Sequence, residues 1–579
     1  MNHLVIPESS QSSPVSNLLA ALGVRFATSR LDSSLANRKA KSAALLVSEA
    51  QFAELCERAG SGPGSLADLL TGFTDVLVYP FSGTPKAVQA LQGVVGGRVS
   101  VAAMSESGST DYSLAESRNM CGPFAGLRVR GAQCGHDVAL RAEAAAYPAD
   151  SIVANSVGNL LTKFSLPGVN LFVLSSSAVF DVSAEHLRNL EVTECFSGLV
   201  PLLFFLRHGQ IKLPAGPLQW AHWIIDDPNL RPRYGFLDLK ALVGCVRETG
   251  AAASIAFIPW NHKRTSREIV DLFKENWPQL SICVHGCDHT GSEFSTRTMS
   301  DAMPLIDLAT RRMRRLQAET ALGWEQVMVF PQGRFSGEAM RALRASEMLA
   351  AVNTELLDCQ TGGGVKGGEL LKPAIMSFGG FPLFMRRPAE ETAANFALDL
   401  MLGKPCLIVT HHQYFEHGLN SLRSAVQTLN ALEPALDWTN LERGILSTYS
   451  VNAEAGDEVR VRLYSARTSF VPPAEGTFLL SRAETDPGSV QVFVDGTQVA
   501  ANSVNGDIQF AIRNTGKTAM TIDARSVVPA KPQAGQSTKY RLKVTARRYL
   551  TEVRDNYLCR FPKLTAGAAS LQQMLHKAR

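Results

Sequence analysis

Short apolar runs alternate with helix-like segments through most of the chain. In residues 1–206, segments such as residues 48–60 carry apolar side chains with the period of a helix. Between such segments lie five runs with the length and composition of buried strands: residues 44–48, 75–80, 98–103, 127–131 and 170–176. This alternation predicts an N-terminal open α/β sheet with crossover helices.

The same alternation resumes after a Gly- and Pro-bearing connector at residues 207–218. Five further apolar runs are expected to be strands: residues 222–226, 253–259, 280–286, 326–331 and 406–411. Repeated βα units over residues 218–447 predict a distorted barrel of seven or eight parallel strands, (β/α)7–8.

The texture changes at residue 448, where short alternating strands are separated by Gly, Asn and Asp turns. Residues 448–535 are therefore predicted to form an antiparallel β-sandwich. The last segment, residues 536–579, is basic and is predicted to be partly helical. The fold class is thus a multidomain α/β chain, whose first domain, residues 1–206, we expect to resemble a flavodoxin-like or amidotransferase-like module.

Composition narrows the possible partners and location. A chain of 579 residues is too long for one core, and its net charge of +4, from 57 basic and 53 acidic residues, indicates no nucleic-acid partner. The ten cysteines have no repeated spacing and are expected to be reduced thiols of a cytoplasmic protein. No secretory signal is visible, and the apolar run at residues 199–206 is far shorter than the ~20 residues that a membrane span needs. Nothing in the sequence predicts an oligomeric state.

The candidate chemistry begins with Asp226 and Asp227, which follow an apolar run and precede Pro228. Proline cannot continue a central strand, so both carboxylates are expected at the C-terminal end of a strand, where barrels of this kind place their active sites. Neighbouring strand residues point to opposite faces, so one carboxylate could bind a metal while the other acts as a base. Taken alone, the Asp-Asp-Pro sequence could equally be a surface turn or a helix cap.

His285 and His289 form a second cluster at the end of another predicted strand. With a carboxylate they could bind one divalent ion and leave a position for water, as in a catalytic zinc site. Cys283 and Cys287 leave a structural Cys/His site as an alternative, although no second Cys/His pair has the spacing that such a site needs. Buried histidines without a metal are a further alternative.

Two later strand ends add polar groups. His411, followed by His412, ends the run at residues 406–411 and could supply a general acid. Arg334 follows the run at residues 326–331 and could orient a catalytic carboxylate. Trp260, beside Asn261, also lies at a strand end and could form an aromatic wall for a sugar ring.

In this order, the motifs resemble those of the polysaccharide deacetylase family, carbohydrate esterase family four, over residues 218–430. The run AAASIAFIPWN is also similar to the family's second strand. Pro228 and Gly286 depart from the family pattern, which usually has Gly at the first position and Ser or Thr at the second.

The resemblance implies a role for each motif residue. Asp226 would be the general base, His411 the general acid, and Arg334 the partner of the base. A divalent metal, zinc or alternatively cobalt, manganese or nickel, would be bound by a set of three side chains: Asp227, His285 and His289. The substrate would be contacted by Trp260, Asn261 and His412.

The sequence therefore predicts a metal-dependent deacetylase that removes an acetyl group from an N- or O-acetylated sugar, in the metabolism of a bacterial surface polysaccharide. One alternative is another hydrolase on a related barrel, either a glycosidase or an amidase. A second alternative is a non-catalytic glycan-binding or scaffold protein that retains the metal.

Overall fold

The structure is a computed structural model. It describes residues 3–31, 43–60, 66, 70, 72–104, 109–132, 137–214, 216–453, 458–516, 518–526 and 537–560. The chain divides into two compact units. The first comprises Met1–Ala215, Lys366–Lys372 and Thr392–Gly403, and the second comprises Gly216–Val365, Pro373–Glu391 and Lys404–Arg579.

The first unit is built on one mixed sheet of eleven strands. Its strands are β1 (His3–Pro7), β2 (Phe26–Ser29), β3 (Ala43–Val47), β4 (Phe73–Val78), β5 (Arg98–Ala103), β6 (Ser109–Leu114), β7 (Arg128–Ala132), β8 (Val138–Ala144), β9 (Ala149–Ala154), β10 (Asn159–Leu166) and β11 (Val169–Leu174). Its helices are α1 (Pro14–Ala21), α2 (Glu49–Ala59), α4 (Pro85–Val95), α5 (Arg118–Cys121), α6 (Val192–His208), α11 (Gly367–Leu370) and α12 (Ala393–Met401).

Half of this sheet differs from the open α/β sheet that the sequence predicts. Strands β2, β1, β3, β4 and β11 pair in parallel, as crossover helices require. From β11 onward, β10, β9, β6 and β7 pair antiparallel, and β8 and β5 join them in the same way. Strands of the antiparallel half include β10, in which buried and less buried residues alternate toward its end. Such alternation is typical of antiparallel sheets, whose two faces have different environments. It distinguishes the sheet from a purely parallel flavodoxin-type sheet.

The second unit contains a nearly closed barrel sheet, and all of its strand pairs are parallel. Eight strands follow one another in the order β19, β18, β17, β16, β15, β12, β21, β20. They are β12 (Trp220–Asp226), β15 (Ala253–Phe257), β16 (Leu280–His285), β17 (Glu325–Val329), β18 (Ala350–Asn353), β19 (Leu383–Met385), β20 (Arg387–Pro388) and β21 (Cys406–Thr410). The two edge strands, β19 and β20, are consecutive in sequence and separated by Arg386 alone.

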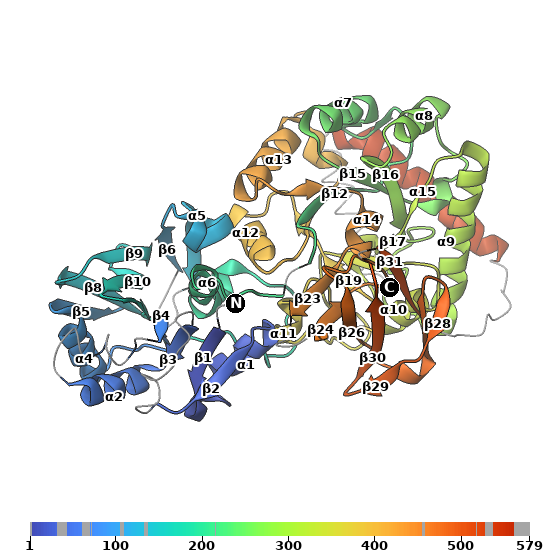
Figure 1. The fold of residues 1–579 in the computed structure, drawn as a ribbon. Coiled ribbons are helices and arrows are strands. Elements are labelled where there is room, and N and C mark those ends of the chain that lie inside the picture. Colours follow the sequence, from blue (N-terminus) through green and yellow to red (C-terminus); the bar gives the residue numbers. More distant parts are fainter. Residues whose placement is uncertain are drawn as a thin grey trace. The chain divides into compact units, whose positions relative to one another are not determined.

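Helices alternate with these strands or follow the last of them, as expected for βα units. They are α7 (Leu239–Thr249), α8 (Arg267–Glu275), α9 (Met299–Thr320), α10 (Gly337–Arg344), α13 (Asn420–Leu432) and α14 (Leu441–Leu446). Figure 1 shows α7, α8 and α9 outside strands β12, β15 and β16. All five predicted barrel strands are present, and the sequence analysis missed β18, β19 and β20.

The alternation of side chains along the strands positions the polar groups. Ile224, Cys283 and Phe384 belong to one hydrophobic cluster in the barrel. Side chains two residues apart on a strand share a face. The polar residues two positions further along therefore stand one layer above this apolar core: Asp226, His285 and Arg386.

Residues 449–526 form two smaller sheets. The first has the order β23, β24, β26, β30, β29 and the second has the order β25, β31, β27, β28. These strands are β23 (Tyr449–Ala453), β24 (Glu458–Leu463), β25 (Arg467–Phe470), β26 (Gly476–Ala483), β27 (Val490–Val494), β28 (Thr497–Val499), β29 (Asn502–Val504), β30 (Asp507–Asn514) and β31 (Met520–Ser526). Both sheets contribute to one hydrophobic cluster. The pairing is not wholly antiparallel, because β24 and β26 run in parallel.

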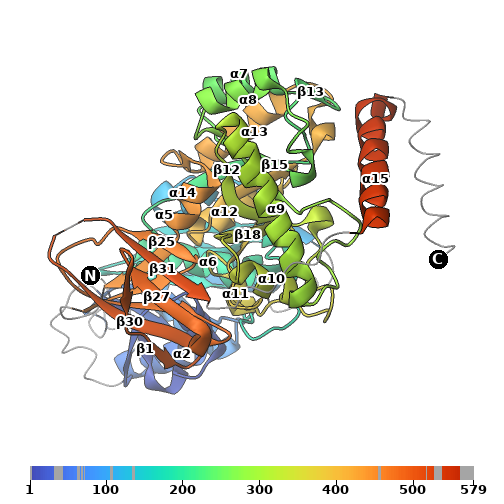
Figure 2. The same cartoon turned by 90° about the vertical axis from the view of Figure 1, so that its right-hand side faces the viewer.

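The last described α-helix is α15 (Thr538–Asn556), which belongs to the second unit. Figure 2 shows it as one straight helix. Unlike an ordinary amphipathic helix, α15 buries polar side chains, namely Arg548, Glu552 and Asp555, beside Val544. No helix among the described residues is long and apolar enough to cross a membrane.

Candidate active site

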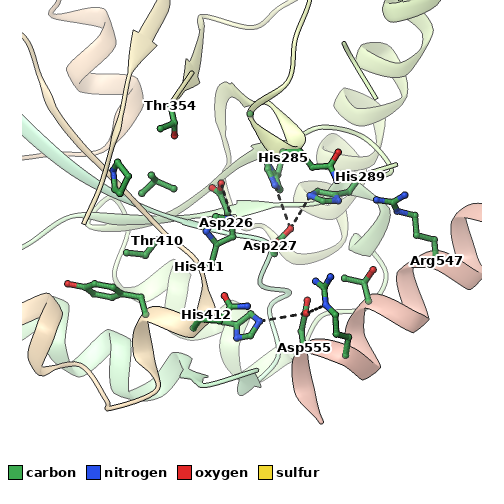
Figure 3. Close-up of a pocket in the computed structure, with 18 of the residues that line it drawn as sticks. Asp226, Asp227, His285, His289, Thr354, Thr410, His411, His412, Arg547 and Asp555 are labelled. Carbon is green, nitrogen blue, oxygen red and sulfur yellow. Dashed lines mark hydrogen bonds and ion pairs between the residues drawn. The ribbon is translucent and has the colours of Figure 1, made fainter. Parts of the chain in front are cut away.

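A pocket of about 1310 Å³ opens where the barrel strands end. The ends of β12, β16 and β21 contribute one part of its wall, and helix α15 contributes another (Figure 3). From the barrel, the wall includes Asp226, Asp227, His285, His289, Thr354, Arg386, His411 and His412. From α15, it includes Lys543, Arg547, Leu550, Arg554 and Asp555. The pocket thus lies where barrels of this class carry their active sites.

Asp226 and Arg386 form a buried, two-pronged ion pair in this pocket. Arg386 donates from Nη1 to Asp226 Oδ1 at 2.7 Å and from Nη2 to Oδ2 at 2.6 Å. Burial by itself would raise the pKa of Asp226, but the charge and hydrogen bonds of Arg386, together with the charges of His285 and His411, outweigh burial and leave that pKa below its usual value. Asp226 is therefore an oriented, ionised carboxylate at neutral pH.

Asp227 points away from this pair and toward two imidazoles (Figure 3). Its Oδ1 lies 3.2 Å from His289 Nε2 and 3.6 Å from His285 Nε2. Among the described residues, these three are the one group of potential metal ligands whose ligand atoms all lie within 4.8 Å of one another. Asp226 is the last residue of β12 and Asp227 follows it with φ 84°, so the two adjacent carboxylates contact different groups.

The loop between His285 and His289 is held by a buried carboxylate. Glu293 accepts hydrogen bonds from three consecutive backbone N–H groups, those of Cys287, Asp288 and His289. Gly286 has φ +63°, and a Cβ there would overlap with Glu293 Oε2 and with the Pro331 ring. Glycine at this position is therefore a packing requirement of the loop that presents His289.

Two of the three grouped residues have an unusual backbone. Asp227 has φ 84° and His289 has φ 53°, in the left-handed region that non-glycine residues seldom adopt. Asp227 also precedes Pro228, which restricts the residue before it to extended conformations. Such strain persists where surrounding structure imposes it, and it is concentrated at functional sites.

The two histidines differ in their acid–base properties. Burial would lower the pKa of His285, but the carboxylates of Asp226 and Asp227 outweigh burial and raise it. Burial also lowers the pKa of His289, to about 4, and there Asp227 opposes it only in part. A backbone contact orients the ring of His285, because its Nδ1 lies 3.1 Å from the carbonyl oxygen of Val329. If Nδ1 donates to that oxygen, Nε2 carries a free lone pair on the side of Asp227.

The group fits a divalent metal ion. Asp227 Oδ1 is buried and has no hydrogen-bond donor among the described residues, although two imidazole nitrogens face it. Ligands about 2.1 Å from a tetrahedral ion lie about 3.4 Å apart, close to the two separations found here. One carboxylate and two imidazoles leave room for water, which is the donor set of a catalytic site and not of a closed structural one.

His411 and His412 have different environments. His411 is exposed in the pocket, and its Nε2 lies 4.0 Å from Asp226 Oδ2. His412 is buried, with its Nε2 3.7 Å from Asp555 Oδ1 and its ring against the backbone of Gly235, where a Cβ would overlap with it. His411 is thus the better placed to exchange a proton with a bound molecule.

The predicted partner of Asp226 was wrong. Arg334 is exposed and donates to Ser292 Oγ at 3.3 Å, whereas Arg386 makes the ion pair with Asp226. Strand β17 ends at Val329, and Arg334 follows a short 3-10 helix at residues 331–333, where it is exposed. Arg386 instead follows β19 directly, on the inward-facing side.

The structure places two predicted substrate contacts outside this pocket. Asn261 is fully buried, and Trp260 packs edge-on against Tyr549 of α15, with the Arg264 guanidinium 5.0 Å from its ring centre. Neither is among the described residues that line the pocket. Trp260 thus contacts α15 directly, and Asn261 Oδ1 accepts from Arg264, which in turn donates to Glu552 of α15. Cys283, the core residue considered as a structural ligand, lies 3.7 Å from Ser254 Oγ.

Two contributors to the pocket, Arg386 and the helix α15, were not predicted from the sequence. Arg386 follows the apolar run of β19 and precedes Arg387 and Pro388, a strand-end signal similar to that of Asp226. The basic residues of α15 recur at helical spacing, but nothing in their sequence indicates that the helix returns to the barrel.

Comparison with known proteins gave neither a matching family model nor a matching curated protein. Among solved structures, the chain is similar to Agd3, described as a novel carbohydrate deacetylase, with 11% identity and a TM-score of 0.44 over 91% of this chain and 99% of that chain.

Two further similarities each cover about two fifths of this chain. A family 4 carbohydrate esterase from Streptomyces lividans, solved in complex with acetate, has 14% identity and a TM-score of 0.25 over 38% of this chain and 92% of that chain. A CE4 family pseudoenzyme from Bacillus anthracis has 11% identity and a TM-score of 0.24 over 40% of this chain and 69% of that chain. The similar solved structures thus include proteins described as a carbohydrate deacetylase, a carbohydrate esterase and a pseudoenzyme.

Proposed function

We propose that this protein is a metal-dependent carbohydrate deacetylase that cleaves the acetyl group from an N- or O-acetylated sugar of a glycan or glycan precursor. The observation that carries the proposal is the arrangement of two adjacent aspartates in one pocket. Asp226 is oriented by Arg386, while Asp227 faces His285 and His289. An oriented base beside a three-ligand metal site is the equipment that amide and ester hydrolysis requires.

Each residue has a distinct chemical role in this proposal. A divalent ion, most simply zinc, held by Asp227, His285 and His289 would supply a Lewis acid and make water more acidic. Asp226 accepts a proton from the attacking water, and Arg386 holds the carboxylate in position. His411, exposed beside Asp226, donates a proton to the leaving amine or alcohol of the sugar.

The arrangement disfavours the glycosidase alternative. Glycoside hydrolysis needs two carboxyl groups that flank the sugar from opposite sides, about 5–9.5 Å apart. Here one carboxylate of the aspartate pair is in the ion pair with Arg386, and the other faces the two histidines.

We further propose that the glycan is a bacterial surface polysaccharide, processed in the cytoplasm.

The test measures acetate and metal in the same samples. The full chain, loaded with zinc, is incubated with a panel of N- and O-acetylated sugars, and acetate release is compared between wild type and Asp226→Asn. We expect Asp226→Asn to bind metal normally and to lose activity by about 100-fold or more, the range for a lost general base. Asp271→Asn, at a half-exposed aspartate of α8 that does not line the pocket, is the matched control and is expected to retain activity.

Metal content provides the second arm. His289→Gln is expected to lose the bound ion, whereas His417→Gln, at an exposed histidine, is expected to keep it. Zinc-loaded wild type that releases no acetate from any panel member would refute the deacetylase. New reducing ends without acetate would indicate a glycosidase, and a bound metal with neither product would indicate a non-catalytic protein.

A further inference from the structure

Helix α15 is held against the barrel by polar contacts along one face. Tyr540 donates to Asp288 Oδ2 at 3.2 Å, next to the metal-site residue His289. Two turns or more further along, Glu552 accepts from Arg264 at 2.7 Å, and Asp555 accepts from Tyr234 at 2.7 Å. These contacts define which side of α15 faces the pocket.

Arg548 lies on the buried side of α15, near the metal-site residues. Its side chain is 1% exposed, and none of its three guanidinium nitrogens has a hydrogen-bond partner among the described residues. The positive charge of Arg548 lowers the pKa values of both Asp227 and His289, so its guanidinium lies near these two proposed metal ligands. A buried guanidinium without an acceptor is unfavourable, so an acceptor supplied by a bound molecule would stabilise it.

Arg547 and Lys543 add two more cations to the pocket wall. Figure 3 shows Arg547 extending from α15 toward His289. Neither residue makes an ion pair within the part of the chain that the structure describes. Arg554, one turn or more further along the same helix, behaves differently, because it contacts Asp555 at 2.7 Å.

The nearby carboxylates of the wall have other partners. Asp226 is in the ion pair with Arg386, Asp227 faces the histidines, and Asp555 is engaged by Tyr234 and Arg554. The two remaining wall carboxylates, Glu355 and Glu390, are exposed and belong to barrel loops. Lys543 and Arg547, at positions i and i+4 of α15, therefore line the pocket without an ion pair among the described residues, and Arg548, at position i+5, is buried near Asp227 and His289 without a hydrogen-bond acceptor.

We propose that Lys543, Arg547 and Arg548 form an anion subsite beside the metal site, and that the acetylated substrate carries a carboxylate or phosphate group near the sugar to be deacetylated. The identification of the ligand as a substrate rests on the proposed deacetylase function. Guanidinium groups match the planar, paired oxygens of carboxylates and phosphates, whereas a neutral sugar offers only hydroxyl acceptors. The metal-site group lies next to these cations, so one molecule can contact both.

Calorimetric binding to the full chain tests this proposal with four probes: inorganic phosphate, a neutral N-acetylglucosamine disaccharide, N-acetylglucosamine 6-phosphate and a disaccharide of glucuronate and N-acetylglucosamine. Acetate is assayed in the same samples, so the proposed function is judged separately. The variants are Arg547→Gln and Lys543→Gln. Arg541→Gln removes the same charge from an exposed position of α15 and is the matched control.

We expect one anionic sugar to bind wild type about tenfold or more tightly than the neutral disaccharide, the effect of one charge-assisted hydrogen bond. Preference for the phosphate or for the uronate identifies the source of the anion. Arg547→Gln and Lys543→Gln should lose this preference without weakening the neutral sugar, and Arg541→Gln should retain it. Arg548→Lys, which keeps the charge, should retain more of the preference than Arg548→Met.

Three results would overturn the anion subsite. These are equal affinity of wild type for neutral and anionic sugars, equal effects of Arg547→Gln and Arg541→Gln, and failure of every probe to bind, inorganic phosphate included. Selective binding of an anion without acetate release would instead uphold the subsite and count against the deacetylase. Acetate release from neutral and anionic sugars at equal rates would do the reverse.

Discussion

Arg386 holds Asp226 through two parallel hydrogen bonds, of 2.7 and 2.6 Å, and both side chains are almost completely buried. This pair connects the last residue of β12 with the single residue between β19 and β20, the two edges of the barrel sheet. The contact that orients the proposed base therefore also lies at the place where the barrel is not closed by strand pairing.

The first prediction concerns this ion pair. Arg386→Met should lower the free energy of unfolding by about 3–5 kcal/mol, because it leaves the Asp226 carboxylate buried without a partner. It should also lower acetate release. Arg334→Met, at the exposed arginine that the sequence favoured, should change stability by less than about 0.5 kcal/mol. Urea unfolding and acetate assays on both variants measure the difference, and equal effects would contradict the assignment of Arg386.

A second prediction concerns Gly286, which follows His285 and begins the loop that leads to His289. Gly286→Ala and Gly250→Ala both place a Cβ at positive φ, which costs about 1–2 kcal/mol. Only position 286 also produces overlap, with Glu293 and Pro331, whereas no atom lies within 4 Å of a Cβ at position 250. Gly286→Ala should therefore be less stable by a further 1–3 kcal/mol or so and should bind zinc more weakly. Similar unfolding curves and zinc affinities for the two variants would show that the loop can yield.

The two adjacent histidines should respond differently to substitution. His411→Ala should reduce acetate release by about 100-fold, the loss typical of a general acid, with little change in stability. His412→Ala should lower the free energy of unfolding by about 2–4 kcal/mol, because it empties a packed site between Gly235 and Asp555. Turnover and thermal unfolding of each variant distinguish the roles, which would have to be exchanged if His412→Ala remained stable and lost activity.

The fourth prediction is a pH dependence of stability from His222, a fully buried residue of β12. Its Nδ1 lies 2.8 Å from the Thr439 carbonyl oxygen and its Nε2 lies 2.9 Å from Ser254 Oγ. Burial lowers its pKa from 6.5 to about 4. Between these values the unfolded chain binds a proton that the folded protein excludes, so this contribution to stability is complete above pH 6.5 and is lost as the pH falls toward 4.

The slope that His222 contributes can be measured. Wild type should lose up to about 1.4 kcal/mol of unfolding free energy per pH unit in this window relative to His222→Gln, which does not titrate. Urea unfolding of both proteins at several values between pH 4 and pH 7 tests this. Parallel curves for the two proteins would show that folding does not lower the pKa of His222.

Much of the barrel, and the grouping of Asp227, His285 and His289, could be predicted from the sequence, because the relevant signals are local. The five predicted barrel strands are continuous apolar runs, the pattern of parallel strands buried on both faces. Asp226, Asp227, His285 and His411 each stand at the end of such a run. The carboxyl ends of parallel strands meet at one end of a barrel, so local pattern was sufficient to bring them together.

Other features depended on tertiary structure. The sequence has an arginine shortly after two of the barrel strands, Arg334 after β17 and Arg386 after β19. Only the folded structure shows that Arg386 contacts Asp226. The antiparallel half of the N-terminal sheet and the parallel pair of β24 and β26 depend on which strands become neighbours, and the alternation within each strand does not determine that. Helix α15 shows the same limit. Its basic side chains are plain in the sequence, but their place in the pocket arises from contacts with Asp288, Arg264 and Tyr234, residues more than 250 positions away.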